Sequence, residues 1–300
     1  MYSYHQPVLL HESVSALITD PDGIYVDVTF GGGGHSQAIL QRISDKGRLI
    51  AFDQDPDSEK NIPDDPRFTF VPCNFSFLNK FLRYHNAFPV DGILADFGVS
   101  SYQFDTPERG FSYRFDGKLD MRMNPGKGIT AGDVINDYPE QKLMKVFFQY
   151  GELSNARKIA NKIAADRLMQ KITTTTELVE CLKPLIPAHK ENKILSQLFQ
   201  ALRIEVNAEM EVIEKFLLQT TDALKQGGKL VTIAYHSLED RLVKNFMRSG
   251  NLEGKIEKDF YGNPLIPFTS VISKAQIPDA EEIERNPRAR SAKMRTATKK

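Results

Sequence analysis

The chain has 300 residues, 41% of them hydrophobic, which is enough for one large domain or two unequal ones. This composition excludes intrinsic disorder as the main state, and 19 Gly with 16 Pro are too few for a low-complexity chain. The net charge is zero, yet residues 285–300 hold seven basic residues and no acidic one. Such an end is typical of a protein that touches phosphates, although a solvated tail is the commoner explanation of a charge run.

The cysteines and the first residues indicate where the protein works. Cys73 and Cys181 are far apart and no His cluster has ligand spacing, so neither a disulfide framework nor a metal site is expected. The chain starts without the basic and apolar stretches of a signal peptide, and no apolar run approaches the ~18 residues of a membrane span. We therefore expect a cytoplasmic protein without a membrane partner. Its oligomeric state stays open, a homodimer being one alternative.

Short β-branched runs alternate with helical stretches over the first hundred residues, which predicts a parallel sheet with crossover helices. The predicted strands span residues 24–30, 48–53, 68–71 and 92–96, and a further strand spans 230–235. A helix through Ile213 and Leu224 is expected to stop at Gly227 and Gly228, just before that last strand. The sequence therefore predicts an α/β fold with a Rossmann-like sheet.

The middle of the chain interrupts this pattern. Residues 104–138 are rich in Gly, Pro, Asp and aromatics without a clean period and predict a long ordered loop, after which helical periodicity takes over. Thr174 and Glu177 form a capping box for one of these helices. We predict a sheet domain in two parts, residues 1–103 and 206–300, with a helical insertion at 104–205. The segment 289–298 is either a last strand or a basic arm.

Four consecutive glycines at residues 31–34 follow the first predicted strand and open a helix. Glycines let the backbone approach a ligand closely, and the start of a helix offers free N–H groups. Asp53 ends the next strand about 20 residues later, where an acid accepts hydrogen bonds from ribose hydroxyls. The combination predicts a ribose-containing cofactor, NAD or S-adenosylmethionine, and the alternative is a tight turn with an incidental acid.

The later strands favour S-adenosylmethionine. Residues 224–228 and the apolar strand after them resemble the helix-to-strand passage of class I S-adenosylmethionine methyltransferases. Asp96 ends the fourth strand, where that class places residues that bind the target. Cytosine-N4 and adenine-N6 methyltransferases carry an Asp-Pro-Pro-Tyr type motif there, and this chain departs from it.

Eight blocks follow one another in order over nearly the whole chain, at residues 4–10, 33–36, 96–101, 108–112, 119–123, 199–204, 236–241 and 286–291. They include Tyr4-His5, Gly33-Gly34-His35-Ser36, Asp96-Phe97-Gly98-Val99-Ser100-Ser101 and His236-Ser237-Leu238-Glu239-Asp240-Arg241. Together they resemble the bacterial MraW (RsmH) family.

This resemblance implies a class I methyltransferase sheet with an inserted all-helical domain. It implies methylation, by S-adenosylmethionine, of the exocyclic N4 of a cytosine in 16S ribosomal RNA near the decoding centre of the small ribosomal subunit. The cofactor contacts that it implies fall on Gly33, Gly34, His35, Asp53, Phe75, Asp96 and Gln103. Without the family, Phe75 is more simply a core aromatic.

Methyl transfer to the cytosine amine benefits from an acceptor for its N–H groups, because the lone pair of the amine is delocalised into the ring. Asp96 and His236 are the catalytic candidates, since both follow predicted strands at one crevice. The alternative for Asp96 is a role in cofactor binding alone. The alternative for His236 is to orient the helix that we expect Ser237 to cap.

Basic residues near aromatics or in clusters are the candidates for RNA binding. They are Arg109 and Arg122 in the aromatic-rich loop, Arg157 and Lys158 in the basic stretch 142–171, and Arg288 and Arg290 near the end. For Arg109 and Arg122 the alternative is a structural loop that closes the domain junction, and for the others solvated surface charge is the simpler explanation. For the whole protein, the alternatives are a nucleotide-dependent oxidoreductase, a non-catalytic ribosome-assembly factor and a DNA cytosine methyltransferase.

Overall fold

The computed structural model describes residues 7–269 and 274–300, and the chain divides into two compact units. The sheet unit comprises the described residues up to Gly98 together with Met210–Lys300, and the helical unit comprises Val99–Glu209. Tyr4 and His5, which belong to the first block of the family resemblance, lie outside the described residues.

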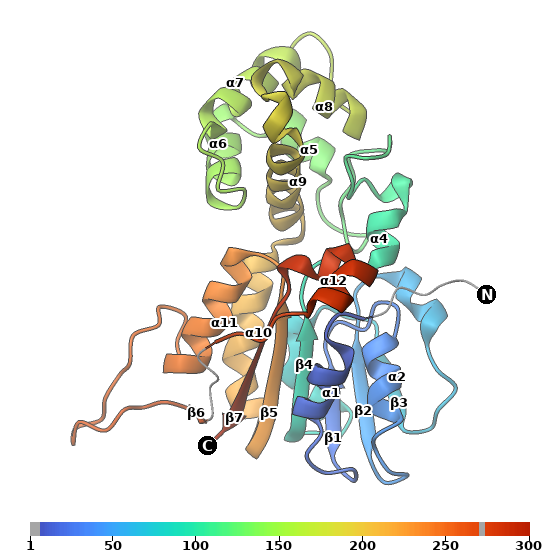
Figure 1. Cartoon of the computed structure of the whole chain (residues 1–300), viewed down its shortest axis with the longest axis vertical. Helices are drawn as coiled ribbons and strands as arrows, with labels where there is room; N and C mark the ends of the chain where they lie inside the picture. Colours follow the sequence, from blue (N-terminus) through green and yellow to red (C-terminus); the bar gives the residue numbers. More distant parts are fainter. Residues whose placement is uncertain (1–6, 270–273) are drawn as a thin grey trace. The chain divides into compact units, whose positions relative to one another are not determined.

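Within the described residues, the sheet unit has seven strands in the order β3-β2-β1-β4-β5-β7-β6 (Figure 1). They are β1 (Ile24–Asp27), β2 (Arg48–Phe52), β3 (Phe68–Val71), β4 (Val90–Asp96), β5 (Leu224–Ala234), β6 (Phe268–Thr269) and β7 (Lys293–Lys299). Neighbouring strands among β1–β5 pair in parallel, and β7 pairs antiparallel with both β5 and β6. This order is that of a doubly wound Rossmann-like sheet, so the predicted fold class is confirmed.

Helices cover the two faces of the sheet. In the sheet unit they are α1 (Leu10–Leu17), α2 (Gly34–Leu40), α3 (Leu78–Tyr84), α10 (Glu209–Ala223), α11 (Ser237–Ser249) and α12 (Ala280–Arg285). Successive strand residues point to opposite faces, and so Val26 belongs to one buried cluster and Tyr25 to another. The first cluster packs under α3, α10 and α11, and the second packs under α1 and α2. The unit therefore has three layers, with polar groups left at the ends of the strands.

Two parts of the sheet unit differ in detail from the prediction. The glycines Gly227 and Gly228 do not separate a helix from a strand, because β5 already begins at Leu224 and the ladder with β4 shifts register between Val90 and Gly92. Gly227 has a φ of 81°, which only glycine adopts freely. The segment 289–298 is not a basic arm: most of it lies in β7. Of the two alternatives for this segment, the strand is correct.

The helical unit has its own core. Its helices are α4 (Ser101–Asp105), α5 (Ala131–Asp137), α6 (Glu140–Gln149), α7 (Ala156–Asp166), α8 (Thr175–Leu182) and α9 (Glu191–Asn207). Short 3₁₀ helices in the two units span Pro56–Asn61 (η1), Phe75–Phe77 (η2), Pro107–Arg109 (η3), Lys183–Leu185 (η4), Ala188–Lys190 (η5) and Pro287–Ser291 (η6). Phe147, Ile159 and Leu198 are buried together from α6, α7 and α9. The predicted capping box of Thr174 and Glu177 is present at the start of α8.

The prediction of a loop through residues 104–138 is wrong at its end, where α5 forms. Thr130 and Asp133 cap this helix reciprocally, and its residues Val134 and Ile135 are buried in the helical core. A helix of seven residues gives too few turns for a visible period, so its cap is the stronger signal. No helix among residues 7–269 and 274–300 combines the length and the apolar character needed to cross a membrane.

The borders of the helical unit lie a few residues from the predicted ones, 103/104 and 205/206. Val99 packs against the core of the helical unit, so the unit begins before α4. At the other border, Glu209 receives two hydrogen bonds from Arg203 of α9, at 2.8 and 2.9 Å. The helical unit is therefore longer at both ends than predicted and spans Val99–Glu209.

Candidate functional site

The carboxyl ends of β1, β2, β4 and β5 lie at one edge of the sheet, because these strands run parallel. Asp27, Asp53, Asp96 and His236 end or follow these strands. In open α/β sheets ligands bind at this edge. The structure thus brings together Asp53, Asp96 and His236, which the sequence predicts, and adds Asp27.

The glycine loop between β1 and α2 is tied to the end of β2. The N–H of Gly31 donates to Oδ2 of Asp53 at 2.7 Å, and Nδ2 of Asn61 donates to the carbonyl of Gly31 at 3.0 Å. Gly33 has a φ of 78°, a left-handed conformation that favours glycine. At Gly34, a side-chain carbon would lie 2.2 Å from Cγ of Pro7, so only glycine fits there. The loop is held with its backbone close to Asp53.

Asp53 combines burial with backbone donors. Besides Gly31, the N–H of Asp55 donates to its carboxylate, to Oδ1 at 2.8 Å. Burial raises the pKa of Asp53 to about 6, and the two N–H donors oppose that rise. At neutral pH the carboxylate is therefore ionised, and it retains lone pairs that can accept hydrogen bonds from hydroxyl groups.

Asp96 ends β4 and is held by three neighbours. Its N–H donates to Oγ1 of Thr29 at 2.7 Å, and its Oδ1 accepts a hydrogen bond from the hydroxyl of Tyr235 at 2.8 Å. Its Oδ2 lies 3.8 Å from Nδ1 of His35. Burial raises the pKa of Asp96 to about 6, while His35 and Tyr235 lower it. A carboxyl group with this pKa can accept a proton near neutral pH.

His35 is buried at the start of α2, where its Nε2 lies 3.2 Å from the carbonyl oxygen of Val8. This contact fixes the plane of the ring and directs Nδ1 toward Asp96. The sequence predicts His35 as a cofactor contact, and that role stays a prediction. What the structure shows is its Nδ1 at 3.8 Å from Oδ2 of Asp96.

Asp27 was not predicted as a site residue. Its buried carboxylate accepts hydrogen bonds from the hydroxyl of Ser36 at 2.8 Å and from the N–H of Thr29 at 3.0 Å. Burial raises its pKa. Its hydrogen bonds connect the end of β1 to Ser36 in α2 and so hold the two ends of the glycine loop together. An acid in an otherwise apolar strand, four residues before the glycine loop, was the signal that could have found it.

His236 follows β5 and is the N-cap of α11, so the expectation that Ser237 caps this helix is wrong. The reason lies in Glu239, whose Oε2 accepts hydrogen bonds from the N–H groups of Tyr235 at 2.8 Å and of His236 at 3.3 Å. The other oxygen of Glu239 lies 3.0 Å from Nε2 of His236, and the two side chains are 0% and 8% exposed. The imidazole thus has a buried structural partner, and its catalytic role stays a prediction.

Phe75 and Gln103, the two remaining predicted cofactor contacts, both pack against or bond to other residues of the protein. Phe75 is half-buried in η2, and its ring centroid lies 5.3 Å from that of Phe216 and 6.2 Å from that of Phe97. Gln103 is buried in the helical unit and forms a reciprocal capping box with Ser100 at the start of α4. Contact with the cofactor stays a prediction for both.

A family model described as the MraW methylase family matches residues 2–300. The chain belongs to this family. Relatives named ribosomal RNA small subunit methyltransferase H are 59% identical over 298 residues in Bacteroides fragilis (strain ATCC 25285) and 56% identical over 296 residues in Flavobacterium johnsoniae. Each alignment covers 99% of this chain and 98% of the relative.

Among solved structures, one described as a putative rRNA-methylase from Clostridium thermocellum is similar to the chain with a TM-score of 0.44 and 12% identity, over 99% of this chain and 100% of that one. The family model and the relatives confirm the predicted family and the predicted class of enzyme, a methyltransferase.

The RNA-binding candidates of this MraW family methylase fall into two groups. Arg109 is buried, and its guanidinium donates to the carbonyls of Arg122 and Met123 at 3.0 and 3.1 Å. Arg122 in turn donates to both carboxylate oxygens of Asp120 at 2.8 Å. These two arginines therefore hold the loop 109–123 in shape, and the buried one has little surface to offer to RNA.

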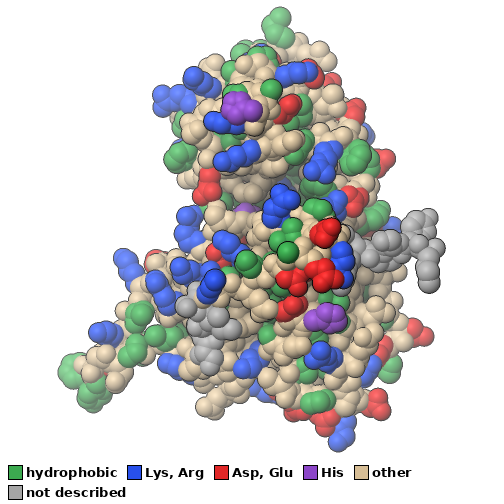
Figure 2. Space-filling view, viewed as in Figure 1, with side chains coloured by type: hydrophobic (Ala, Val, Ile, Leu, Met, Phe, Trp, Pro, Cys, Tyr) green, Lys and Arg blue, Asp and Glu red, His purple; other side chains and the backbone are tan. Residues whose placement is uncertain are grey.

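The remaining candidates are exposed. Arg157 and Lys158 lie on the solvent side of α7, and Arg288 and Arg290 lie on η6. Figure 2 shows basic side chains on the surface of both units, mixed with acidic ones. The C-terminal charges are not all available, because Arg295 is only 8% exposed and its Nε donates to Asp240 at 2.6 Å.

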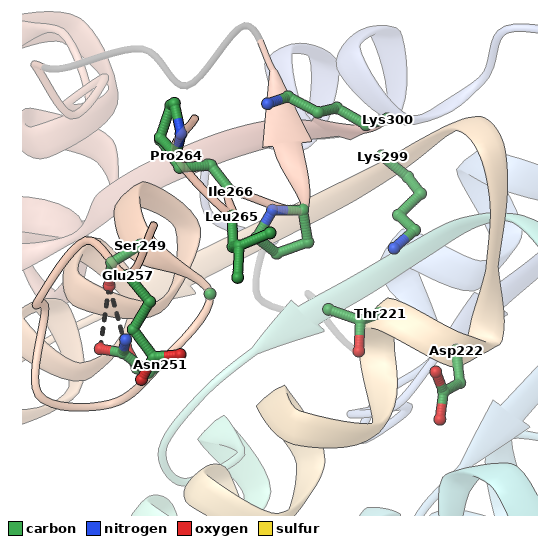
Figure 3. A pocket seen from close by; sticks show the side chains of 12 residues that line it. Thr221, Asp222, Ser249, Asn251, Glu257, Pro264, Leu265, Ile266, Lys299 and Lys300 are labelled. Carbon is green, nitrogen blue, oxygen red and sulfur yellow. Dashed lines mark hydrogen bonds between the residues drawn. The ribbon is translucent and has the colours of Figure 1, made fainter. Parts of the chain in front are cut away.

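A separate pocket of about 580 Å³ lies at the other edge of the sheet, where β7 ends beside the start of β5 (Figure 3). Its lining includes Asp222, Glu257, Lys299 and Lys300 together with Leu265. The charges of this lining are mixed, and the pocket is remote from the carboxyl ends of the parallel strands. It does not contribute to the methylase site.

Proposed function

We propose that the protein transfers a methyl group from S-adenosylmethionine to the exocyclic N4 of a cytosine in 16S ribosomal RNA, near the decoding centre of the small ribosomal subunit. The observation that carries the proposal is the 59% identity, over nearly the whole chain, to a relative named for methylation of small-subunit ribosomal RNA. The choice of cytosine N4 rests on the family resemblance and on the acceptor Asp96 at the site.

The residues at the sheet edge fit the proposed cofactor. Asp53 is ionised at neutral pH and can accept hydrogen bonds from ribose hydroxyls, and the glycine loop beside it lets a ligand approach the backbone. Half-buried Phe75, after β3, offers an apolar surface for an adenine. S-adenosylmethionine supplies a methyl group on a positively charged sulfur, which a nucleophile attacks in line.

In this proposal the protein mainly orients the reacting groups and accepts a proton. A near-attack arrangement of two reactants is worth up to about 7–11 kcal/mol in favourable systems. The N4 lone pair forms the new N–C bond while the S–C bond breaks and its electron pair stays on sulfur. The surplus proton of N4 passes to Asp96, whose pKa of about 6 keeps it ionised at neutral pH.

Incubation of the full-length protein with labelled S-adenosylmethionine and unmodified small subunits, naked 16S ribosomal RNA or DNA tests this proposal. Nucleoside mass spectrometry should detect N4-methylcytidine from the small subunit. Methylation of DNA alone would mean that DNA, and not ribosomal RNA, is the substrate. Binding of cofactor and RNA without any methylation would favour the non-catalytic assembly factor. Retention of NAD but not of S-adenosylmethionine would support the oxidoreductase.

Asp53→Ala is expected to weaken the binding of S-adenosylmethionine by about 1–3 kcal/mol, because the ribose hydroxyls lose a charged acceptor. Isothermal titration calorimetry measures the change at pH 8. Since protonation removes the charge, wild-type affinity should also fall as the pH drops through about 6. Asp64→Ala removes an exposed carboxylate of the same region and serves as the control of equal charge. Equal affinities of the two variants would contradict the role of Asp53.

Arg157→Ala combined with Lys158→Ala is expected to reduce the salt dependence of RNA binding, because the exposed face of α7 loses two cations. The slope of log K against log salt should become shallower by about 0.7–0.9 for each phosphate that the variant no longer neutralises. Filter binding at several salt concentrations measures this slope. The matched control removes two exposed lysines of the sheet unit, Lys80 and Lys244. If both double variants behave alike, α7 does not bind the RNA.

A further inference from the structure

Tyr235 occupies a position that the proposed chemistry does not yet use. It follows the last residue of β5, and its N–H is bound by the fully buried carboxylate of Glu239 at 2.8 Å. Its hydroxyl donates to Oδ1 of Asp96 at 2.8 Å. The backbone of Tyr235 is therefore anchored to α11 while its side chain reaches across to the end of β4.

The hydrogen bond from the Tyr235 hydroxyl completes the set of contacts that hold Asp96. The N–H of Asp96 is held by Thr29, its Oδ1 by Tyr235, and its Oδ2 lies near His35. A carboxylate attached by one oxygen keeps its plane, because rotation about the Cβ–Cγ bond would break that hydrogen bond. The lone pairs on Oδ2 then stay available for a substrate amine.

We propose that Tyr235 is a positioning residue for methyl transfer, which orients the carboxylate of Asp96 and keeps it ionised so that Oδ2 accepts the N4 proton. This inference rests on the proposed function, because it assigns Asp96 as the acceptor. Tyr235 itself does not touch the reacting atoms. It acts through the hydrogen bond to Oδ1.

The electrostatics of the neighbourhood support this role. Burial raises the pKa of the Tyr235 phenol well above its usual value, as do the nearby charges of Asp96, Glu239 and Glu282, so the hydroxyl remains a donor at every working pH. Around Asp96, the acids Asp27 and Glu239 raise its pKa, and His35 and the Tyr235 hydroxyl lower it. Those groups belong to β1, α11, α2 and the end of β5. Without the phenolic donor, one of the groups that oppose the rise of the Asp96 pKa by burial is lost.

Tyr235→Phe should therefore raise the pKa of Asp96. The acceptor must be ionised, so activity falls as the pH drops through that pKa, and the midpoint of this acidic limb should move upward by about 1 pH unit. The profile of kcat/KM for small subunits against pH gives the midpoint, and it is measured at saturating labelled S-adenosylmethionine so that the titration of Asp53 does not contribute. Tyr25→Phe is the matched control, because its buried hydroxyl bonds to residues 19 and 20 at the other edge of the sheet, and its midpoint should stay in place.

A second measurement separates this inference from the proposed function. In protein labelled with ¹³C at aspartate carboxyls, the Asp96 signal is identified by its loss in Asp96→Asn, and its titration midpoint should rise in Tyr235→Phe. This readout needs no substrate, so it still decides if the wild type methylates nothing. If Tyr235→Phe does not fold, wild-type protein labelled at tyrosine Cζ takes its place. One tyrosine signal should then titrate with Asp96 and stop doing so in Asp96→Asn.

The outcomes are distinct. An upward shift of the Asp96 midpoint by NMR, with the control unmoved, supports the inference, and the same shift in kcat/KM links it to catalysis. An unmoved Asp96 midpoint in Tyr235→Phe, or the absence of a tyrosine signal coupled to Asp96, overturns it. Loss of activity at all pH values without any shift also overturns it, because a purely structural residue would give that result.

Discussion

Asp96→Asn is expected to lower kcat for methyl transfer by about 10²–10⁴-fold, the usual effect of removing a group that exchanges a proton in the transition state. Asparagine keeps the shape of the side chain, and its carbonyl oxygen can still accept the hydrogen bond of the Tyr235 hydroxyl. It cannot take up the proton that N4 must lose. The loss should therefore appear in kcat, measured by the rate of N4-methylcytidine formation under single-turnover conditions.

The same variant tests the alternative that Asp96 only binds the cofactor. In that case the dissociation constant for S-adenosylmethionine would rise, and saturating cofactor would restore most of the rate. If Asp96 is the acceptor, calorimetry should find the affinity for the cofactor within a few-fold of the wild type. Restoration of the rate by excess cofactor would contradict the role as proton acceptor.

The pH dependence of the wild type gives an independent check. The pKa of Asp96 is raised to about 6, chiefly by burial, so the carboxylate is ionised above that pH and protonated below it. Since only the ionised form can accept a proton, kcat/KM for small subunits should fall below about pH 6 in the wild type even at saturating S-adenosylmethionine, where the titration of Asp53 no longer limits the rate. Under the same conditions Asp96→Asn should show no such limb in its residual activity.

The sheet could be predicted from the sequence because its strands are short apolar runs that end in recognisable polar residues. The glycine loop, Asp53 and Asp96 were proposed as site residues for the same reason, and the structure places them at the carboxyl ends of parallel strands, where ligands bind in such sheets. Asp27 and α5 were missed although they had local signals, whereas other missed parts depend on contacts between residues distant along the chain. Tyr235 reaches Asp96 across 139 positions, and nothing near either residue indicates that hydrogen bond.

The charged residues show the same limit. Arg109 and Arg295 look like surface cations in the sequence, yet both are buried in the structure. Arg109 donates to backbone carbonyls and Arg295 to the carboxylate of Asp240. Arg157 and Lys158, whose charge pattern is no different, are exposed. Composition and local spacing indicate that a segment is basic, but only the fold decides which cations face solvent.

Removal of residues 293–300 is expected to unfold the sheet unit, and not merely to weaken RNA binding. These residues form β7, which pairs with β5 over six residue pairs from Lys229 to Ala234. Met294 and Ala297 of β7 are buried, and they belong to the clusters on opposite faces of the sheet. The deletion would uncover both clusters and leave the edge of β5 without a partner.

The ion pair between Arg295 and Asp240 adds to this cost. Both side chains are mostly buried, at 8% and 14% exposure. Burial raises the pKa of Asp240, but the hydrogen bond and the charge of Arg295, together with Lys293, outweigh that rise, so the pKa is lowered. Loss of one partner of such a buried pair costs up to about 3–5 kcal/mol. The deletion also removes Lys293, whose Nζ lies 3.4 Å from Oδ2 of Asp240, so the charge of Asp240 remains without compensation. That cost alone is a large part of a total stability of about 5–15 kcal/mol.

Circular dichroism during heating should therefore show no cooperative transition for the chain that ends at residue 292, and Arg295→Ala should unfold at a clearly lower temperature than the wild type. The full-length variant Arg290→Ala is the control, because it also removes a basic residue near the end but changes only an exposed side chain on η6. It should unfold at the wild-type temperature, so any loss of RNA affinity in it reports on charge. A shortened chain that unfolds cooperatively at the wild-type temperature would mean that β5 does not need β7, and the basic end could then act as an arm.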